Sequence, residues 1–282
     1  DEALKRSPHQ GAGFPGAFFF APRLACGHHM LELLLVTLAS ALAGFVDAIV
    51  GGGGLVLLPA LFAVYPGTAP ATLFGTNKSA SVWGTAWAAR LYARRVRLNW
   101  SSLGPAMAAA FAGAALGAWL VTQVSAGGLR KALPFILAAV LIYTLSRKDL
   151  GRDHAPHRSV AAERLIATLI GLVIGFYDGF FGPGTGSFFV FLLVRALGYD
   201  FLHASASAKL LNVATNIAAL AWFVSAGHVM PQVAATMAVA NVAGSYLGTH
   251  LALKRGAGFV RGVFIVVVSL LILRTGWDAW RL

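Results

Sequence analysis

The chain has 282 residues, of which 58% are hydrophobic and 11% are charged, and its formal net charge is +12. An ordinary soluble domain is excluded because too few polar faces are available to cover so many apolar segments, so the composition predicts a membrane protein. The basic residues stand at the ends of apolar runs, as the positive-inside rule describes, and give no reason to expect nucleic-acid binding. The single cysteine, Cys26, excludes an internal disulfide and a Cys-based metal site.

Residues 1–29 differ from everything that follows. They mix charge, proline and glycine around a short phenylalanine run, and Met30 then opens an apolar segment at once. We predict a disordered extension here, or residues that precede the natural start of the protein. A signal peptide is disfavoured because Pro15 and Pro22 interrupt the only apolar part.

The first apolar run, residues 31–64, is interrupted by glycine. The interruption reads Gly44-Phe-Val-Asp-Ala-Ile-Val-Gly-Gly-Gly-Gly54 and carries one carboxylate, Asp47. Each glycine in a helix costs roughly 1 kcal/mol relative to alanine, so four in succession predict a broken helix. Broken backbone at membrane depth is tolerated only where it is buried in protein or lines a cavity.

The rest of the first half is predicted to form three further spans, at residues 72–93, 101–124 and 130–146. The first of these opens with the polar residues Thr76, Asn77 and Lys78, and the second holds Gly113 and Gly117 at a spacing typical of close helix contact. A polar, basic linker then separates the two halves.

The second half repeats the first at an offset of 131 residues. Gly175-Phe-Tyr-Asp-Gly-Phe-Phe-Gly-Pro-Gly-Thr185 mirrors the first interruption, with Asp178 in the place of Asp47 (178 − 47 = 131). The same offset pairs Lys78 with Lys209 (209 − 78 = 131). An intramembrane Asp and an intramembrane Lys rarely align in one register by chance, so we interpret the pattern as an internal duplication. The matching spans are 162–194 (broken), 204–225, 230–253 and 260–280.

We therefore expect an all-α polytopic membrane protein, with about eight transmembrane helices in two homologous four-span repeats whose first helices are broken by glycine. The predicted segments are an extension (1–29), a first repeat (30–148), a linker (149–160) and a second repeat (161–282). If each broken segment crosses the membrane once, the repeats are parallel and both termini are cytoplasmic. A re-entrant break could make the repeats inverted.

Lys78 and Lys209 are the first candidates for a binding site. A lysine at the centre of a membrane helix costs about 2.5–3.5 kcal/mol on insertion scales, so it faces a cavity or a partner. One interpretation is that the two ammonium groups bind an anion. The other is that each lysine pairs with Asp47 or Asp178 and holds helices together. A combined role is a third interpretation, in which the ion pair breaks during transport.

The glycine breaks and nearby polar residues fit anion binding. Backbone N–H groups freed at a break, and the positive end of the half-helix that follows, attract anions. The amides in question belong to Gly52, Gly53, Gly54, Gly184 and Thr185. Asn212 and Asn216 follow Lys209 by three and seven residues and so share its helix face, and together with Thr76 and Asn77 they add neutral donors.

Asp47 and Asp178 have two interpretations of equal weight. A desolvated carboxylate can titrate near neutrality and carry a proton, or it can cap or pair within the broken helix. His203 and His228 are expected near the membrane interfaces. The sequence has no metal-ligand cluster, Walker A loop or dinucleotide fingerprint, so we expect no metal, no cofactor and no ATP-driven pump.

These residues resemble the TauE/SafE permeases, also called the 4-toluene sulfonate uptake permease family. The resemblance is carried by the two Gly-Phe-x-Asp interruptions, by Gly75-Thr-Asn-Lys78 and by Ala208-Lys209-Leu-Leu-Asn212, and it covers the chain from about Leu31 onward. The chain is most similar to the bacterial inner-membrane branch. The resemblance implies transport of sulfite, organosulfonates or related sulfur-containing anions in either direction.

The predicted function is therefore a secondary transporter of the bacterial inner membrane, with a small anion bound between the repeats and proton coupling as a hypothesis. A passive anion channel is one alternative. An intramembrane aspartyl protease is another, although Pro59-Ala-Leu61 precedes Tyr177-Asp178, the reverse of the expected order. The partners are the anion and the bilayer. The exact substrate, the direction, the coupling ion and an oligomeric state stay open.

Overall fold

The computed structural model describes residues 22–124 and 159–280, and every regular element within these two stretches is an α-helix. The helices are α1 (Pro22–Val50), α2 (Gly53–Val64), α3 (Pro70–Ala93), α4 (Trp100–Gln123), α6 (Val160–Phe180), α7 (Thr185–Leu197), α8 (Phe201–Ser225) and α9 (Pro231–Trp280). Gly256, with φ 74° and ψ −169°, breaks α9 into two parts. The predicted span 130–146 lies outside the described residues.

Helix α1 begins earlier than predicted. It starts at Pro22, eight residues before the expected start at Met30 (30 − 22 = 8). Proline is well suited to the first position of a helix, because its missing N–H would have no partner there and its φ is already helical. Residues 22–29 of the predicted extension therefore belong to helix α1.

Four of the described helices are long and apolar enough to cross a membrane, namely His29–Val50, Trp100–Gln123, Val160–Phe180 and Phe201–Ser225. The two arms that follow the glycine breaks are different. Helices α2 and α7 have 12 and 13 residues, or about 18–20 Å at 1.5 Å per residue, which is too short for a hydrocarbon core of about 30 Å. Each predicted broken span is therefore a pair of helices.

Each pair folds back on itself as a helical hairpin. A Cβ on Gly53, at the start of α2, would meet Ala43 and Asp47 of α1. At the other end of α2, burial and the Glu32 carboxylate of α1 raise the pKa of Tyr65. In the second hairpin the Tyr199 hydroxyl, just after α7, donates to Glu163 Oε1 at the start of α6 over 2.5 Å. Hence α2 returns along α1, and α7 returns along α6.

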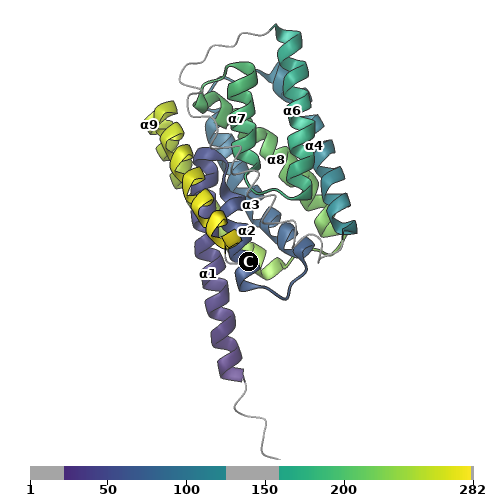
Figure 1. The fold of residues 1–282 in the computed structure, drawn as a ribbon, viewed down its shortest axis with the longest axis vertical. Coiled ribbons are helices and arrows are strands. Elements are labelled where there is room, and N and C mark those ends of the chain that lie inside the picture. The colour runs from purple at the N-terminus through teal and green to yellow at the C-terminus, as the bar shows by residue number, and fades with distance from the viewer. Residues whose placement is uncertain (1–21, 125–158, 281–282) are drawn as a thin grey trace, which may run out of the picture.

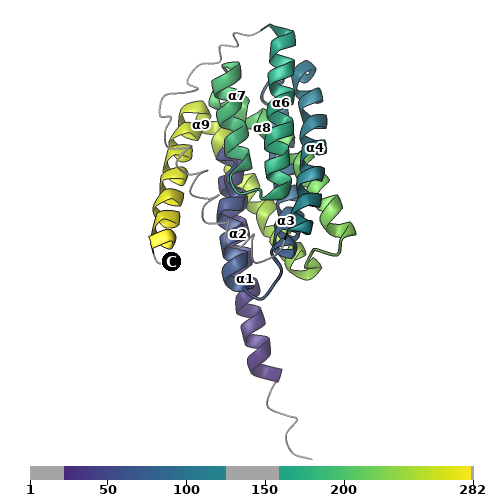
Figure 2. The ribbon, with the colours of Figure 1, turned by 45° about the vertical axis from the view of Figure 1, so that its right-hand side comes forward.

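The two hairpins enter from opposite ends of the molecule. Figures 1 and 2 show α1 starting at the lower end and α6 starting at the upper end. Their tips meet in the middle, where Ser187 of α7 donates its backbone N–H to the Gly51 carbonyl (3.2 Å) and its hydroxyl to the Val50 carbonyl (2.9 Å). The two glycine breaks are therefore hairpin tips that meet inside the molecule.

Small residues allow the long helices to approach closely. A Cβ on Gly113 or Gly117 of α4 would collide with the α6 backbone, at Leu172 and Phe176 respectively. On the other side, Gly244 and Gly248 of α9 meet the α1 backbone in the same way. The predicted small-residue face of 101–124 is thus a real contact, with α6 as its partner.

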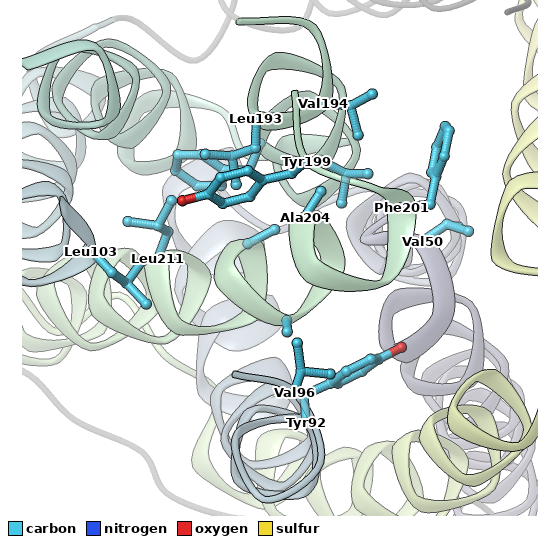
Figure 3. Close-up of a cluster of buried hydrophobic side chains, with 14 of the residues drawn as sticks. Val50, Tyr92, Val96, Leu103, Leu193, Val194, Tyr199, Phe201, Ala204 and Leu211 are labelled. Atoms are coloured by element: carbon cyan, nitrogen blue, oxygen red, sulfur yellow. The ribbon is translucent and has the colours of Figure 1, made fainter. Parts of the chain in front are cut away.

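Helix α3 packs antiparallel to α8 at the centre of the molecule. Gly75 near the start of α3 contacts Phe223 at the end of α8. Figure 3 shows the other end of this pair, where Tyr92 of α3 and Val96, just after α3, belong to the same cluster of buried apolar side chains as Ala204 of α8. The starts of α3 and α8, and those of α4 and α9, are each 131 residues apart (201 − 70 and 231 − 100).

Replacing Gly51 with alanine should destabilise the protein strongly. Gly51 has φ +79°, and an added Cβ would collide with the Gly186 backbone in the opposite hairpin tip. Strain of this kind and overpacking each cost about 1–3 kcal/mol, so we expect roughly 2–5 kcal/mol in the free energy of unfolding. Thermal unfolding in detergent tests this. Gly67→Ala is the control, because nothing lies within 4 Å of its added Cβ, and equal melting temperatures in the two variants would contradict the close tip contact.

Tyr199→Phe should remove a bond that closes the second hairpin. Hydrogen bonds to charged groups contribute about 1.5–3 kcal/mol, and Glu163 is buried beside this hydroxyl. Burial and Glu163 raise the pKa of Tyr199 above its ordinary value of 10.0, so folding favours the protonated tyrosine. The contribution is therefore complete below pH 10.0 and is lost as the pH rises above it. Unfolding measured at pH 7 and pH 11 should show a smaller difference between wild type and variant at the higher pH.

Candidate functional site

A small cavity lies where the two hairpin tips meet. Its volume is about 20 Å³, close to the space that a single water needs. It is lined by residues of both tips and of α3, α8 and α9: Asp47, Gly51, Gly53, Gly54, Asn77, Lys78, Ser81, Thr85, Asp178, Gly182, Thr185, Gly186, Asn212, Asn216 and Asn241. The site is therefore polar, central and built from segments far apart in the sequence.

The first ion pair of the site joins α3 to α6. The ammonium of Lys78 lies 2.5 Å from Asp178 Oδ2, and the two side chains are 5% and 2% exposed. Both residues line the cavity. A charge this deeply buried is tolerated because its partner neutralises it, and loss of either partner would leave an uncompensated charge.

The second ion pair joins α8 to α1. Lys209 Nζ lies 3.2 Å from Asp47 Oδ2 and also donates to the backbone carbonyl of Asp47. The Thr85 hydroxyl of α3 donates to the same carboxylate oxygen over 3.3 Å. Lys209 is fully buried and is not among the residues that line the cavity. Both lysines are thus paired with the aspartate of the other half, and the four charges sum to zero.

Nine of the thirteen predicted site residues line this cavity. The four that do not are Lys209, Thr76, Gly52 and Gly184. Thr76 instead ties α3 to the start of α9, since its hydroxyl donates to the Thr72 carbonyl (2.7 Å) and accepts the Met230 N–H (3.0 Å). Gly52 and Gly184 are the residues just before α2 and α7, and Gly184 has φ 79°.

The cavity also contains six residues that the sequence reasoning left out: Gly51, Ser81, Thr85, Gly182, Gly186 and Asn241. Two of them carried a signal. Ser81 and Thr85 follow Lys78 by three and seven residues, just as Asn212 and Asn216 follow Lys209. The offset of 131 relates these two sets (212 − 81 = 131), so the repeat could have located them. Asn241 carried no comparable signal.

The starts of α2 and α7 lie at the site, where the Thr185 N–H donates to the Gly182 carbonyl over 3.3 Å. Gly53 and Gly54 open α2, Thr185 and Gly186 open α7, and all four line the cavity. No side chain caps either helix start. The first N–H groups of a helix have no partner within it, and the helix dipole places positive charge there. These two helix starts and Lys78 together form a site suited to a small anion.

The described residues contain no group of three or more His, Cys, Asp or Glu side chains placed to hold a metal ion. One polar atom in the lining of the cavity has no hydrogen-bond partner, however. Within the described stretches, the buried Asn77 side chain has no hydrogen-bond partner for its Oδ1. A buried amide oxygen without a partner is costly, and such groups gather where a ligand or water binds.

Residues 36–275 match the family model described as sulfite exporter TauE/SafE. The chain belongs to the TauE/SafE family. A probable membrane transporter protein ORF9 of Sinorhizobium is 37% identical over 87% of this chain and 92% of its own length. The probable membrane transporter protein YfcA of Escherichia coli K12 is 35% identical over 84% of this chain and 87% of its own. A probable membrane transporter protein of Haemophilus influenzae is 32% identical over 84% and 91%.

No solved structure matches the chain. The TauE/SafE match includes both hairpin tips and both ion pairs, because all of these residues lie between 36 and 275. The protein is therefore a TauE/SafE family membrane transporter by its relatives, and the central cavity is its candidate transport site.

Proposed function

We propose that this TauE/SafE protein is a secondary transporter that carries a small sulfur-containing oxyanion, such as sulfite or an organosulfonate, through the cavity between the hairpin tips. The observation that carries the proposal is the convergence of two uncapped helix starts and Lys78 on one buried cavity. Transporters place half-helix starts against anionic groups of their substrates near the bilayer midplane.

We infer an architecture of two inverted repeats, in each of which the broken first segment is a re-entrant hairpin and three further segments cross the membrane. Support comes from three relations: the offset of 131 residues between helix starts, the opposite entry of the two hairpins, and the antiparallel packing of the equivalent helices α3 and α8. In inverted repeats the substrate site lies at the interface of the two halves. The cavity lies between α3 and α8 and so fits this arrangement.

The substrate class rests on chemistry and on the family description. A sulfite or sulfonate group presents several oxygen acceptors, which match the amide groups of the helix starts and the carboxamides of Asn77, Asn212 and Asn216. The matched family model is described as a sulfite exporter. Four charges that sum to zero leave the site neutral, so an anion would enter with a compensating proton on one aspartate.

The cavity is too small to hold the proposed substrate in the described conformation. A cavity of about 20 Å³ has room for roughly one water, so a sulfur oxyanion enters only after the tips move apart. The two hairpins touch mainly through Ser187, Gly51 and Gly186, a small contact that relative motion of the two halves can break. Alternating access would open the cavity first on one side and then on the other.

We propose that the end of the molecule containing the α3–α4 connection faces the cytoplasm of a bacterial inner membrane. Eight lysines and arginines besides the two paired lysines stand at helix ends or connections on this side: Arg90, Arg94, Arg95, Arg97, Arg164, Arg195, Lys254 and Arg255. Arg23, in contrast, stands at the start of α1 on the other side. Positive charge marks the cytoplasmic side. Helix α1 then starts on the opposite side, contrary to the arrangement expected for two full crossings.

An aspartyl protease is disfavoured by the ion pairs. Catalysis by such a pair requires two carboxylates that share one proton. Here Asp47 and Asp178 each contact a different lysine, so each carboxylate has its own partner. A passive channel stays the alternative, and counterflow separates it from a transporter.

The test is anion flux in proteoliposomes containing the purified protein. Sulfite and a panel of small sulfonates are measured in both directions, together with counterflow. We expect saturable flux and counterflow for at least one sulfur oxyanion. Flux that does not saturate would favour a channel, and the absence of flux for every member of the panel would remove the proposed substrate class.

A further inference from the structure

The two ion pairs occupy equivalent positions but have unequal surroundings. Lys209 binds both the carboxylate and the backbone carbonyl of Asp47 and does not reach the cavity. Lys78 contacts the carboxylate of Asp178 and lines the cavity. Within the described stretches, no hydrogen bond joins Lys78 to a backbone carbonyl.

The Lys209 contact belongs to a set of bonds that closes the end of α1. The last carbonyls of a helix have no partner within it and must be satisfied by other groups. Tyr92 donates to the Ala48 carbonyl (3.0 Å), and Ser187 donates to the carbonyls of Val50 and Gly51. The Asp47 carbonyl also accepts the Gly51 N–H over 2.8 Å, so Lys209 adds a second donor and a positive charge at this negative end of the helix dipole, which is the stabilising arrangement.

The end of α6 lacks the matching bond. Its turn is closed by Gly182 N–H, which donates to the Tyr177 carbonyl, and by the Thr185 hydroxyl, which donates to the Gly182 carbonyl. Lys78 takes no part in either bond. Its ammonium lies beside Gly182, where an added Cβ would sit 3.4 Å from Nζ. Lys78 can therefore change its partner without exposing the end of a helix.

We propose that the Lys78–Asp178 pair alone exchanges with the anion and the proton, whereas the Lys209–Asp47 pair is a permanent cap of α1. This proposal rests on the proposed transport function. The anion displaces the Asp178 carboxylate from the Lys78 ammonium, and Asp178 takes a proton at the same time. The charge of the site stays at zero, because one monoanion, such as a sulfonate or hydrogen sulfite, and one proton enter together.

The charged and titratable groups around Asp178 agree with this division. Lys78 faces it from α3, Asp47 shares its cavity from α1 and is held by Lys209 from α8, and Tyr177 precedes it on α6. Helix α4 contains no titratable residue, and Arg195, the one such residue of α7, stands in its last turn at the far end from the tip. Lys78 is thus the cation that decides whether Asp178 holds a proton.

The test compares two matched double variants, each of which removes one whole pair and leaves no unpaired charge: Lys78→Gln with Asp178→Asn, and Lys209→Gln with Asp47→Asn. Flux per folded protein and melting temperature are measured for both in proteoliposomes and detergent. We expect the first double variant to keep its melting temperature within a few degrees and to lose flux by at least about 100-fold, as expected for loss of a charged binding contact.

The second double variant should melt at a lower temperature, because a glutamine is a weaker cap than an ammonium, and its folded fraction should keep a KM within about threefold of wild type. If that double variant does not fold, Lys209→Arg is measured instead, because arginine keeps the charge and the donors. We expect Lys209→Arg to transport the anion. Equal losses of flux in the two double variants, or loss of flux in folded Lys209→Arg, would overturn the division of roles.

Failure of the proposed function has a different signature. Wild-type protein would then carry none of the tested anions, and the melting temperatures would still decide between the pairs. A lower melting temperature for the Lys209 and Asp47 variant alone supports the cap. The cap is contradicted if only the Lys78 and Asp178 variant melts at a lower temperature, or if the two double variants melt at the same temperature.

Discussion

Lys78→Ala should abolish saturable anion flux, lowering it by at least about 100-fold, because it removes the one cation that lines the cavity in the described part of the chain. A bound oxyanion at this depth has almost no water to stabilise it, so the ammonium and the helix starts must supply its binding energy. Alanine keeps the helix and offers neither charge nor donor. Flux of a sulfonate into proteoliposomes is the measurement.

Arg90→Ala is the matched control for that experiment. Arg90 lies in the last turn of the same helix, α3, and its side chain is exposed outside the cavity, so the substitution removes an equal charge far from the site. We expect its flux to stay close to wild type. If the flux of Lys78→Ala stayed within threefold of the wild-type flux, the role of Lys78 would be purely structural.

Lys78→Ala also leaves Asp178 as a buried carboxylate without a cation. Removing one partner of a buried pair costs about 3–5 kcal/mol, so part of the protein is expected to unfold. Folded protein is therefore quantified by gel filtration before reconstitution, and flux is expressed per folded molecule. This normalisation separates loss of binding from loss of protein.

The helices that carry the site were predictable from hydropathy and glycine alone. The glycine breaks at 51–54 and 182–184 lie at the observed hairpin tips, and Lys78, Asp47, Asp178, Asn212 and Asn216 all line the cavity. These residues were recognisable because charge and amide groups are expensive within an apolar run. The free-energy cost of placing such a group in an apolar run can be read from the sequence around it, without knowledge of the fold.

The direction of the helices and the unequal contacts of the two lysines were not predictable in this way. The length of an apolar run does not show whether the chain crosses the membrane once or folds back as a hairpin. The hairpin of α1 and α2 has the same hydropathy as a single long span interrupted by glycine. Lys209 was expected to bind the anion because it matches Lys78 in the repeat. Its second bond, to the carbonyl of Asp47, depends on how α8 packs against the end of α1, which no local pattern encodes.

Asp178→Asn should uncouple anion movement from the proton gradient. In wild type, a proton on Asp178 frees Lys78 for the anion, so flux rises as the pH falls on the side from which the anion enters. Asparagine is permanently neutral and leaves Lys78 available at every pH. We therefore expect a lower KM, a flux that no longer depends on pH, and loss of accumulation against a concentration gradient when a pH gradient is imposed.

Accumulation of a sulfonate in proteoliposomes with an alkaline interior is the measurement, because the charge of a sulfonate does not change near neutral pH. Glu163→Gln is the control: it converts a buried carboxyl to an amide outside the cavity and keeps an acceptor for Asn99 and Tyr199. Accumulation should persist in this control. If Asp178→Asn still accumulates the sulfonate with wild-type pH dependence, the proton is carried by another group, and the neutral balance of the four charges must be restored by a different ion.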